Sequence, residues 1–222
     1  MPHYLRPHVT GGCVFFTVAL ATRGSRLLVD EVGLLREAVR LTKRERPFGI
    51  DAWVVLPDHL HCVWTLPARD GDFSTRWGAI KARFTRSLRV SGRVGFHPTD
   101  AQGGTRGAVG YNPTLPSASK LAKGEAGIWQ RRFWEHHIRD EADFAAHLRY
   151  CWINPVKHGL VERAADWPFS SIHRDIRDGR VEQDGRMWRQ KVSSESRLGF
   201  HPTVATGRER VMVGWNPTLR LL

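Results

Sequence analysis

The stretch IDAWVVLPDHLHCVWTL, residues 50–66, holds two runs of β-branched and aromatic residues separated by a Pro-Asp pair. Runs of this length and composition predict two β-strands, over residues 50–56 and 59–66. Pro57 and Asp58 predict a tight turn between them. The two strands should therefore pair as an antiparallel hairpin at the centre of a sheet.

The segments before and after the hairpin predict one further strand and two helices. Residues 13–20 (CVFFTVAL) predict a buried strand. An amphipathic helix is expected from Asp30, its N-cap, to about Arg46, because its apolar residues recur at helical spacing. A second amphipathic helix is expected over residues 73–88.

The second half of the chain predicts an extended segment and a third helix. Residues 127–138 are rich in aromatic residues and should be extended, and residues 141–153 should form a helix capped by Asp140. We expect Asn154-Pro155 to end or bend this helix, because a residue before proline disfavours the helical region. The order of elements predicts an α+β fold, an antiparallel sheet with helices packed on it.

Composition points to a basic protein with a polyanionic partner. The chain has 222 residues, 41% of them hydrophobic, and a formal net charge of +12, which favours nucleic acid as the partner. Three cysteines without metal or redox spacing argue against a disulfide framework and favour a reducing cytoplasm. Because there is no run of 18 apolar residues and no apolar signal core at the start, we expect no membrane span.

One segment occurs twice. Residues 93–115 and 197–219 align without a gap, with 15 identities in 23 positions, and both copies are rich in Gly and Pro. Two distant copies do not make a solenoid, which needs adjacent repeats. We interpret them as translated repetitive DNA inserted into the gene; the alternative is a pair of loops that grip DNA.

His59 and His61 form a candidate metal pair. On a strand, residues two apart project to the same face, so both imidazoles should lie side by side while Leu60 points into the core. A His-x-His pair alone is weak evidence, because many such pairs are ordinary surface residues. Its place at the start of a strand in a rigid hairpin strengthens the metal interpretation.

Tyr150 is a candidate nucleophile. It is the only one of three tyrosines on a predicted helix, and Asn154 lies one turn later on the same face. A phenol and an amide placed this way could approach one metal together. A tyrosine with a pKa near 10 needs activation, which a metal-polarised phosphate would supply. The alternative is a tyrosine packed against the sheet.

Residues 129–137 interleave aromatic rings with Arg131 and Arg132, a composition typical of segments that hold single strands. The alternative is a strand with one face in the core and a charged outer face. Lys157 could bind phosphate or be solvated. We interpret Cys62 and Cys151 as structural and His158 as a turn residue bonded through its backbone.

These motifs together resemble the REP-associated tyrosine transposases, which belong to the HUH single-tyrosine (IS200-like) transposases. The resemblance rests on residues 11–12, 15–18, 46–48, 52–61, 128–136, 153–159 and 166–171, in family order. It covers roughly residues 1–90 and 127–178. The two repeat copies are departures from the family pattern, and the first could hinder docking of the tyrosine helix.

The resemblance implies a ferredoxin-like sheet with the HUH pair, His59 and His61, on a central strand. It makes Tyr150 the nucleophile that forms a 5′-phosphotyrosine link and Asn154 the third metal ligand. The cofactor would be Mg²⁺ or Mn²⁺, and the partner single-stranded or hairpin DNA from REP-type palindromes, bound by a monomer or weak dimer. The residues we expect to contact DNA are basic: Arg6, Lys81, Arg83, Arg86, Arg131, Arg132 and Lys157.

These expectations define a catalytic domain over residues 1–178, interrupted by the insertion at about 91–126 and followed by a basic tail over 179–222. The expected location is the bacterial cytoplasm, in association with the nucleoid. Two other functions stay open: a hairpin-binding protein without turnover, and a metal phosphodiesterase that uses water and cuts without Tyr150.

Overall fold

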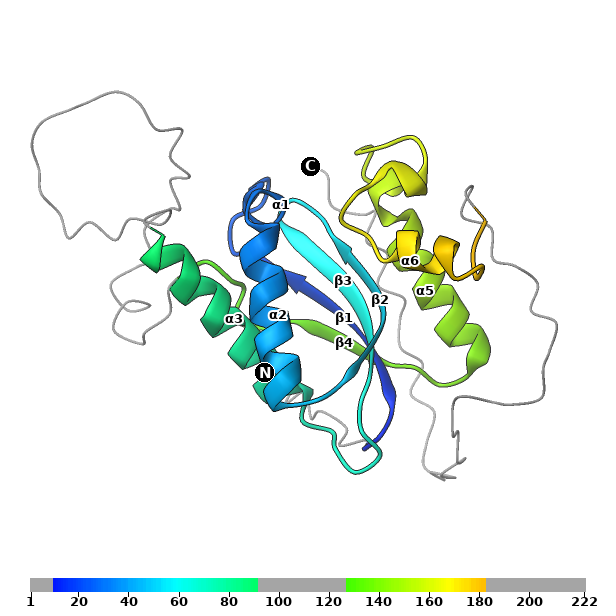
Figure 1. Ribbon diagram of the computed structural model, residues 1–222, viewed down its shortest axis with the longest axis horizontal. Coiled ribbons are helices and arrows are strands. Elements are labelled where there is room, and N and C mark those ends of the chain that lie inside the picture. Colours follow the sequence, from blue (N-terminus) through cyan, green and yellow to red (C-terminus); the bar gives the residue numbers. More distant parts are fainter. Residues whose placement is uncertain (1–9, 92–126, 183–222) are drawn as a thin grey trace, which may run out of the picture. The chain divides into compact units, whose positions relative to one another are not determined.

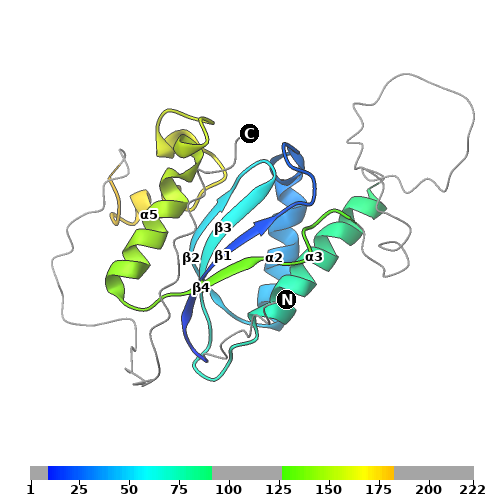
Figure 2. The ribbon, with the colours of Figure 1, turned by 180° about the vertical axis from the view of Figure 1, so that it is seen from behind.

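The computed structural model describes residues 10–91 and 127–182, which form a four-stranded antiparallel sheet with helices on both faces (Figures 1 and 2). In chain order the elements are β1 (Cys13–Ala19), α1 (Leu27–Asp30), α2 (Val32–Glu45), β2 (Gly49–Val55), β3 (His59–Thr65), α3 (Phe73–Val90), β4 (Trp134–His137), α5 (Glu141–Lys157), the 3₁₀ turn η1 (Ala164–Asp166) and α6 (Ile172–Arg177). No helix in these two ranges is long and apolar enough to cross a membrane.

The strand order is β2-β3-β1-β4, the order of a ferredoxin-like sheet. Strand β3 lies between β2 and β1, so the predicted hairpin strand with the two histidines is central. The short edge strand β4 pairs with β1 alone. The predicted α+β fold, with helices packed on an antiparallel sheet, is confirmed.

The two faces of the sheet differ because side chains alternate along each strand. On one face, residues such as Phe16, Leu60 and Trp64 are fully buried in the main core beneath α2 and α3. Trp77, Ile80 and Phe84 supply the α3 side of this core. The opposite face, which carries Phe15, Thr17 and His61, meets α5.

The first predicted helix is wrong at its start. Asp30 ends the short helix α1, and α2 begins at Val32 after Glu31, with no side-chain cap. Leu27, Leu28 and Val29 are buried. Their packing in the core favours a separate helical turn, α1, before the amphipathic helix begins.

The third predicted helix is wrong at its end, because α5 continues through Pro155 to Lys157. A proline removes one backbone donor and crowds the preceding turn. Both Asn154 and Pro155 are buried, and the N–H of His158 closes the last turn on the carbonyl of Asn154 at 3.0 Å. Asp140 caps the start as predicted, accepting a hydrogen bond from the N–H of Asp143.

Candidate active site

His59 and His61 lie on one face of β3, and Leu60 between them is fully buried in the main core. Their ring centroids are 5.0 Å apart. The Nδ1 of His59 lies 2.7 Å from the carboxylate of Asp58, whose pKa is held below its usual value by this hydrogen bond. An Nδ1–H that donates to Asp58 leaves the Nε2 lone pair of His59 available.

His61 is a buried, neutral imidazole. Its Nδ1 lies 2.9 Å from the hydroxyl of Thr17 on β1, and burial, followed by the charge of His59, lowers its pKa well below the usual value. Its Nε2 is buried and has no hydrogen-bond partner among the described residues. A buried nitrogen of this kind in a native protein calls for an explanation.

Tyr150 on α5 meets His61 across the sheet face. The two ring centroids are 5.0 Å apart, and the ring of Phe15 lies 5.7 Å from that of Tyr150. Burial raises the pKa of Tyr150, and a side-chain hydrogen bond from Asn154 partly offsets that rise. The phenol and the amide of α5 therefore share one site with the imidazole of β3, which is far from them in sequence.

The residues fit a divalent cation. In the part of the chain that the structure describes, the carbonyl oxygen Oδ1 of Asn154 is buried without a hydrogen-bond partner, as is Nε2 of His61. With Nε2 of His59 they form a neutral set of two imidazoles and one carbonyl oxygen. Such a set leaves a cation its full charge for the substrate, and its imidazoles suit Mn²⁺ better than Mg²⁺.

Two residues at the end of α5 complete the cluster. The ring of His158 lies 5.0 Å from that of His59, and the ammonium of Lys157 lies 4.9 Å from the centroid of the Tyr150 ring. His158 is bonded through its backbone N–H, as expected of a turn residue, and it is the C-cap of α5. Its place beside His59 was not predicted from the sequence. The signal was the spacing: His158 follows Asn154 by four residues, as Asn154 follows Tyr150.

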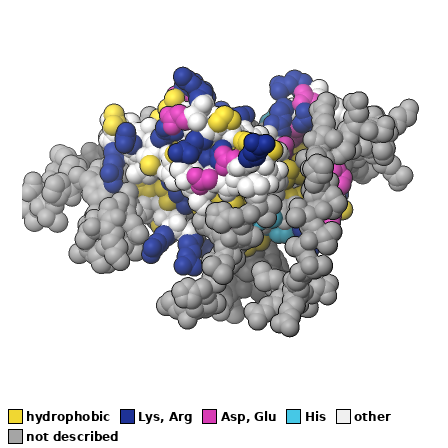
Figure 3. All heavy atoms as spheres, turned by 90° about the horizontal axis from the view of Figure 1, so that it is seen from below, with side chains coloured by type: hydrophobic (Ala, Val, Ile, Leu, Met, Phe, Trp, Pro, Cys, Tyr) yellow, Lys and Arg dark blue, Asp and Glu magenta, His cyan; other side chains and the backbone are white. Residues whose placement is uncertain are grey.

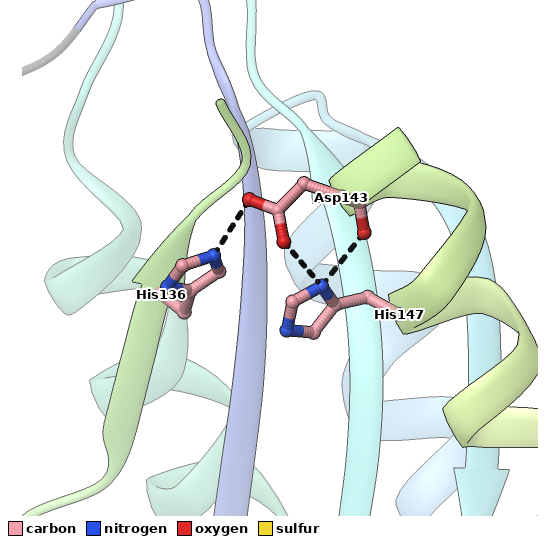
Figure 4. A group of neighbouring side chains, drawn as sticks. All are labelled: His136, Asp143 and His147. Carbon is pink, nitrogen blue, oxygen red and sulfur yellow. Dashed lines mark hydrogen bonds and ion pairs between the residues drawn. The ribbon is translucent and has the colours of Figure 1, made fainter. Parts of the chain in front are cut away.

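A second group of possible metal ligands lies between β4 and α5 (Figure 4). One ligand atom each of His136, Asp143 and His147 lies within 4.8 Å of the others, so the group could hold a divalent metal ion. The Nε2 of His136 lies 2.8 Å from one carboxylate oxygen of Asp143, and the Nδ1 of His147 lies 3.1 Å from the other. No spacing in the sequence predicted this group.

The basic residues expected to bind DNA have different surroundings. Arg83 is ion-paired to Glu45 at 2.6 Å and also donates to Thr42, so it ties α3 to α2. Lys81 donates to the carbonyl of Gln130 at 3.0 Å. Arg86, Arg131 and Arg132 are exposed, and Lys and Arg side chains are spread over the described surface in Figure 3. Arg6 lies outside the described residues.

The aromatic side chains of residues 129–137 differ in their surroundings. The isolated bridge between Trp129 and Leu20, and a ring contact with Phe84, place Trp129 against the main core. Phe133 packs there too. Trp134 at the start of β4 is 47% exposed. The core interpretation is therefore confirmed for Trp129 and Phe133, while the nucleic-acid interpretation of the exposed Trp134 stays a prediction.

The comparisons with known proteins point to one family. The chain is 44% identical over 179 residues to the REP-associated tyrosine transposase of Escherichia coli K12, covering 81% of this chain and 87% of that protein. A relative of the same family name from Haemophilus influenzae is 39% identical and covers 80% of this chain and 89% of its own length. No family model matches the chain.

A solved structure of a REP-associated tyrosine transposase bound to a REP hairpin is similar in fold. It shares 40% identity at a TM-score of 0.64 and covers 89% of this chain and 99% of the other.

Proposed function

Because this chain belongs to the REP-associated tyrosine transposase family, we propose that it cuts and rejoins single-stranded DNA at palindromic hairpins through Tyr150. The hairpin partner is carried over from the solved relative, which is bound to a REP hairpin. The net charge of +12 agrees with a polyanionic partner.

The observation that carries the proposal is the meeting of Tyr150, His61 and Asn154 at the contact of α5 with β3. Two buried polar atoms in this group, His61 Nε2 and Asn154 Oδ1, have no partner among the described residues. A purely structural cluster would leave their desolvation uncompensated, at about 1–3 kcal/mol for each group. A metal-dependent site gives both atoms a role.

Tyr150 attacks the scissile phosphorus through its phenol oxygen. A bond forms between that oxygen and phosphorus, and the bond from phosphorus to the 3′ oxygen of the leaving strand breaks. The phenol gives up its proton, the leaving 3′ oxygen gains one, and the 5′ end stays linked to the enzyme as a phosphotyrosine. A free 3′-OH can reverse the step and rejoin the strands.

The neighbours of Tyr150 prepare this attack. Asn154 donates a hydrogen bond that favours the phenolate, and Lys157 places a positive charge over the ring. Mg²⁺ or Mn²⁺ held by His59, His61 and Asn154 would polarise the scissile phosphate and stabilise the leaving oxygen. Phe15 packs against both His61 and Tyr150 and so helps to fix the position of the two rings relative to each other.

The test is a covalent complex. The protein is incubated with a hairpin oligonucleotide and Mn²⁺, and an adduct that survives a denaturing gel is expected. Tyr150→Phe should abolish the adduct and the cut, while DNA affinity stays within about twofold because no phosphate contact is removed. Tyr4→Phe and Tyr111→Phe, the same change at the two other tyrosines, serve as matched controls and should form the adduct.

Two results would favour the other functions. Tight hairpin binding with neither adduct nor cut in the unmodified protein would favour a binding protein without turnover. Cutting at full rate by Tyr150→Phe would make water the nucleophile and end the covalent scheme.

A further inference from the structure

We propose that Trp134 is the stacking site for one unpaired base of the DNA strand that Tyr150 cuts. The inference rests on the proposed function for the identity of the strand, and it adds a binding residue at the edge of the sheet. Of the three large hydrophobic side chains exposed in residues 10–91 and 127–182, Trp134 alone is aromatic, with 47% of its surface accessible.

Trp134 lies on the same face of the sheet as the candidate active site. Thr17 on β1 is paired with Trp134 on one side and with His61 on the other. The three residues therefore form one row across β4, β1 and β3. Because neighbouring strands are about 4.8 Å apart, the backbone of Trp134 is roughly 10 Å from that of His61. A nucleotide near the scissile phosphate could span this gap.

A continuous set of rings joins Trp134 to Tyr150. The Trp134 ring is nearly parallel to His136, with an interplanar angle of 6° and a centroid distance of 6.0 Å. His136 stacks on His147 at 4.7 Å, and His147 contacts Phe15 at 4.7 Å. Phe15 in turn contacts Tyr150. A base on Trp134 would extend this row outward.

Asp143 fixes the two histidines behind Trp134 (Figure 4). Its carboxylate accepts a hydrogen bond from Arg139, and its two oxygens lie 2.8 Å from Nε2 of His136 and 3.1 Å from Nδ1 of His147. The Nδ1 of His147 lies 2.8 Å from the carbonyl oxygen of Asp143 and must also donate. These hydrogen bonds hold the rings of His136 and His147 in place beside Trp134.

The surroundings of Trp134 suit a nucleic-acid strand. Arg131 and Arg132 are exposed in the turn that leads into β4. Aromatic rings that stack on bases beside guanidinium groups that contact phosphates are the usual means of holding single strands. A tryptophan that is 47% exposed and lies parallel to the His136 ring offers an aromatic surface to a planar, uncharged partner such as a base.

The test uses a hairpin oligonucleotide in which 2-aminopurine replaces, one at a time, each unpaired base beside the stem. We expect its fluorescence to be quenched at one position on binding. Trp134→Ala should remove that quench and weaken binding about 5- to 150-fold, the range for loss of one stacked base. Trp134→Phe, which keeps a ring, should restore most of both. Val90→Ala, at another exposed hydrophobic residue, is the control and should behave as the unmodified protein.

The experiment separates this inference from the proposed function. If Trp134→Ala binds with unchanged affinity and keeps the quench at the same position as the unmodified protein, the stacking site is refuted, even where Tyr150 still forms its adduct. If no adduct forms in the unmodified protein, a quench that depends on Trp134 still establishes the stacking site, because the readout needs binding alone.

Discussion

The hydroxyl of Thr17 acts on the candidate metal site through His61. It lies 2.9 Å from Nδ1 of that ring, and the other ring nitrogen, Nε2, has no hydrogen-bond partner within residues 10–91 and 127–182. The partner of one ring nitrogen decides the tautomer and orientation of an imidazole ligand, and losing such a partner commonly costs 10–100-fold in metal affinity. Thr17 is therefore a positioning residue in the proposed function.

Replacing Thr17 by valine keeps the shape of the side chain and removes its hydroxyl. We expect Thr17→Val to raise the Mn²⁺ concentration for half-maximal cleavage by about 10–100-fold, while cleavage at saturating Mn²⁺ falls less. Direct Mn²⁺ titration by calorimetry should show the same loss of affinity without DNA. Thr75→Val, on the first turn of α3, is the matched control; equal Mn²⁺ affinity in Thr17→Val and this control would remove Thr17 from the metal site.

At the scale of elements, Asp143 joins α5 to β4. Its carboxylate binds His136 on β4 and both Arg139 and His147 in the chain around the start of α5. Its pKa of about 2 lies below the unfolded value near 3.9. The lowered pKa stabilises the folded protein fully above about pH 4, and this contribution is lost as the pH falls through about 2.

The contribution of Asp143 to folding should be visible as a pH-dependent difference. We expect Asp143→Asn to lower the free energy of unfolding by about 1–2 kcal/mol at pH 5, after allowance for solvent screening. The deficit relative to the unmodified protein should shrink toward pH 2, as measured by urea unfolding. Asp30→Asn, at an exposed carboxylate, should show a small deficit of about 0.5 kcal/mol or less at every pH.

The same variant also tests whether His136, Asp143 and His147 bind a metal ion instead of only hydrogen-bonding to one another. The group in Figure 4 is a cation site if two results are found together. Mn²⁺ raises the melting temperature of the unmodified protein, and Asp143→Asn binds one Mn²⁺ ion fewer per chain than the unmodified protein. The hydrogen-bonded anchor predicts equal Mn²⁺ stoichiometry in both proteins.

The elements themselves show what sequence patterns can predict. The hairpin strands were predictable because their β-branched runs and the Pro-Asp turn agree with one another and with the core. The end of α5 was not, because the rule against helix before proline is local, whereas the burial of Asn154 and Pro155 is a tertiary effect. The start of α2 failed for a similar reason, since buried leucines before Asp30 extend the helical path.

The residue types of the candidate site could be predicted from the sequence, but the residues that lie beside them in space could be predicted less well. Spacing alone placed Tyr150 and Asn154 on one helix face and the two histidines on one strand face. That α5 would lie over β3, with His158 beside His59, depends on long-range packing. The Asp143 group joins residues from two elements, and no motif in the sequence marks it. The ion pair by which Arg83 joins α3 to α2 could not be predicted, because a charged residue on a helix surface is equally compatible with contact to solvent or to DNA.

At the scale of the whole molecule, the insertion predicted at about residues 91–126 would be the main departure of this chain from the family pattern. It lies outside the described residues, as does the second repeat copy, so their interpretation as inserted repetitive DNA stays a prediction. The ring contact of Trp129 with Phe84 brings the chain after the insertion back to the middle of α3. From there to Ser91, which ends the described part of α3, is roughly 10 Å along the helix.

Deleting residues 93–115 removes the first repeat copy and leaves Gly92 and residues 116–126 to connect the two sides. Twelve residues reach about 40 Å when extended, several times the distance they must span, so we expect the deletion variant to fold. The shorter loop should raise the free energy of unfolding by about 1 kcal/mol, as measured by urea unfolding. Covalent adduct formation should stay within about threefold of the full chain, because every residue of the proposed site is retained. A folded deletion variant that binds the hairpin weakly and forms no adduct would instead mean that the repeat contacts DNA, which would make it a functional loop of this transposase.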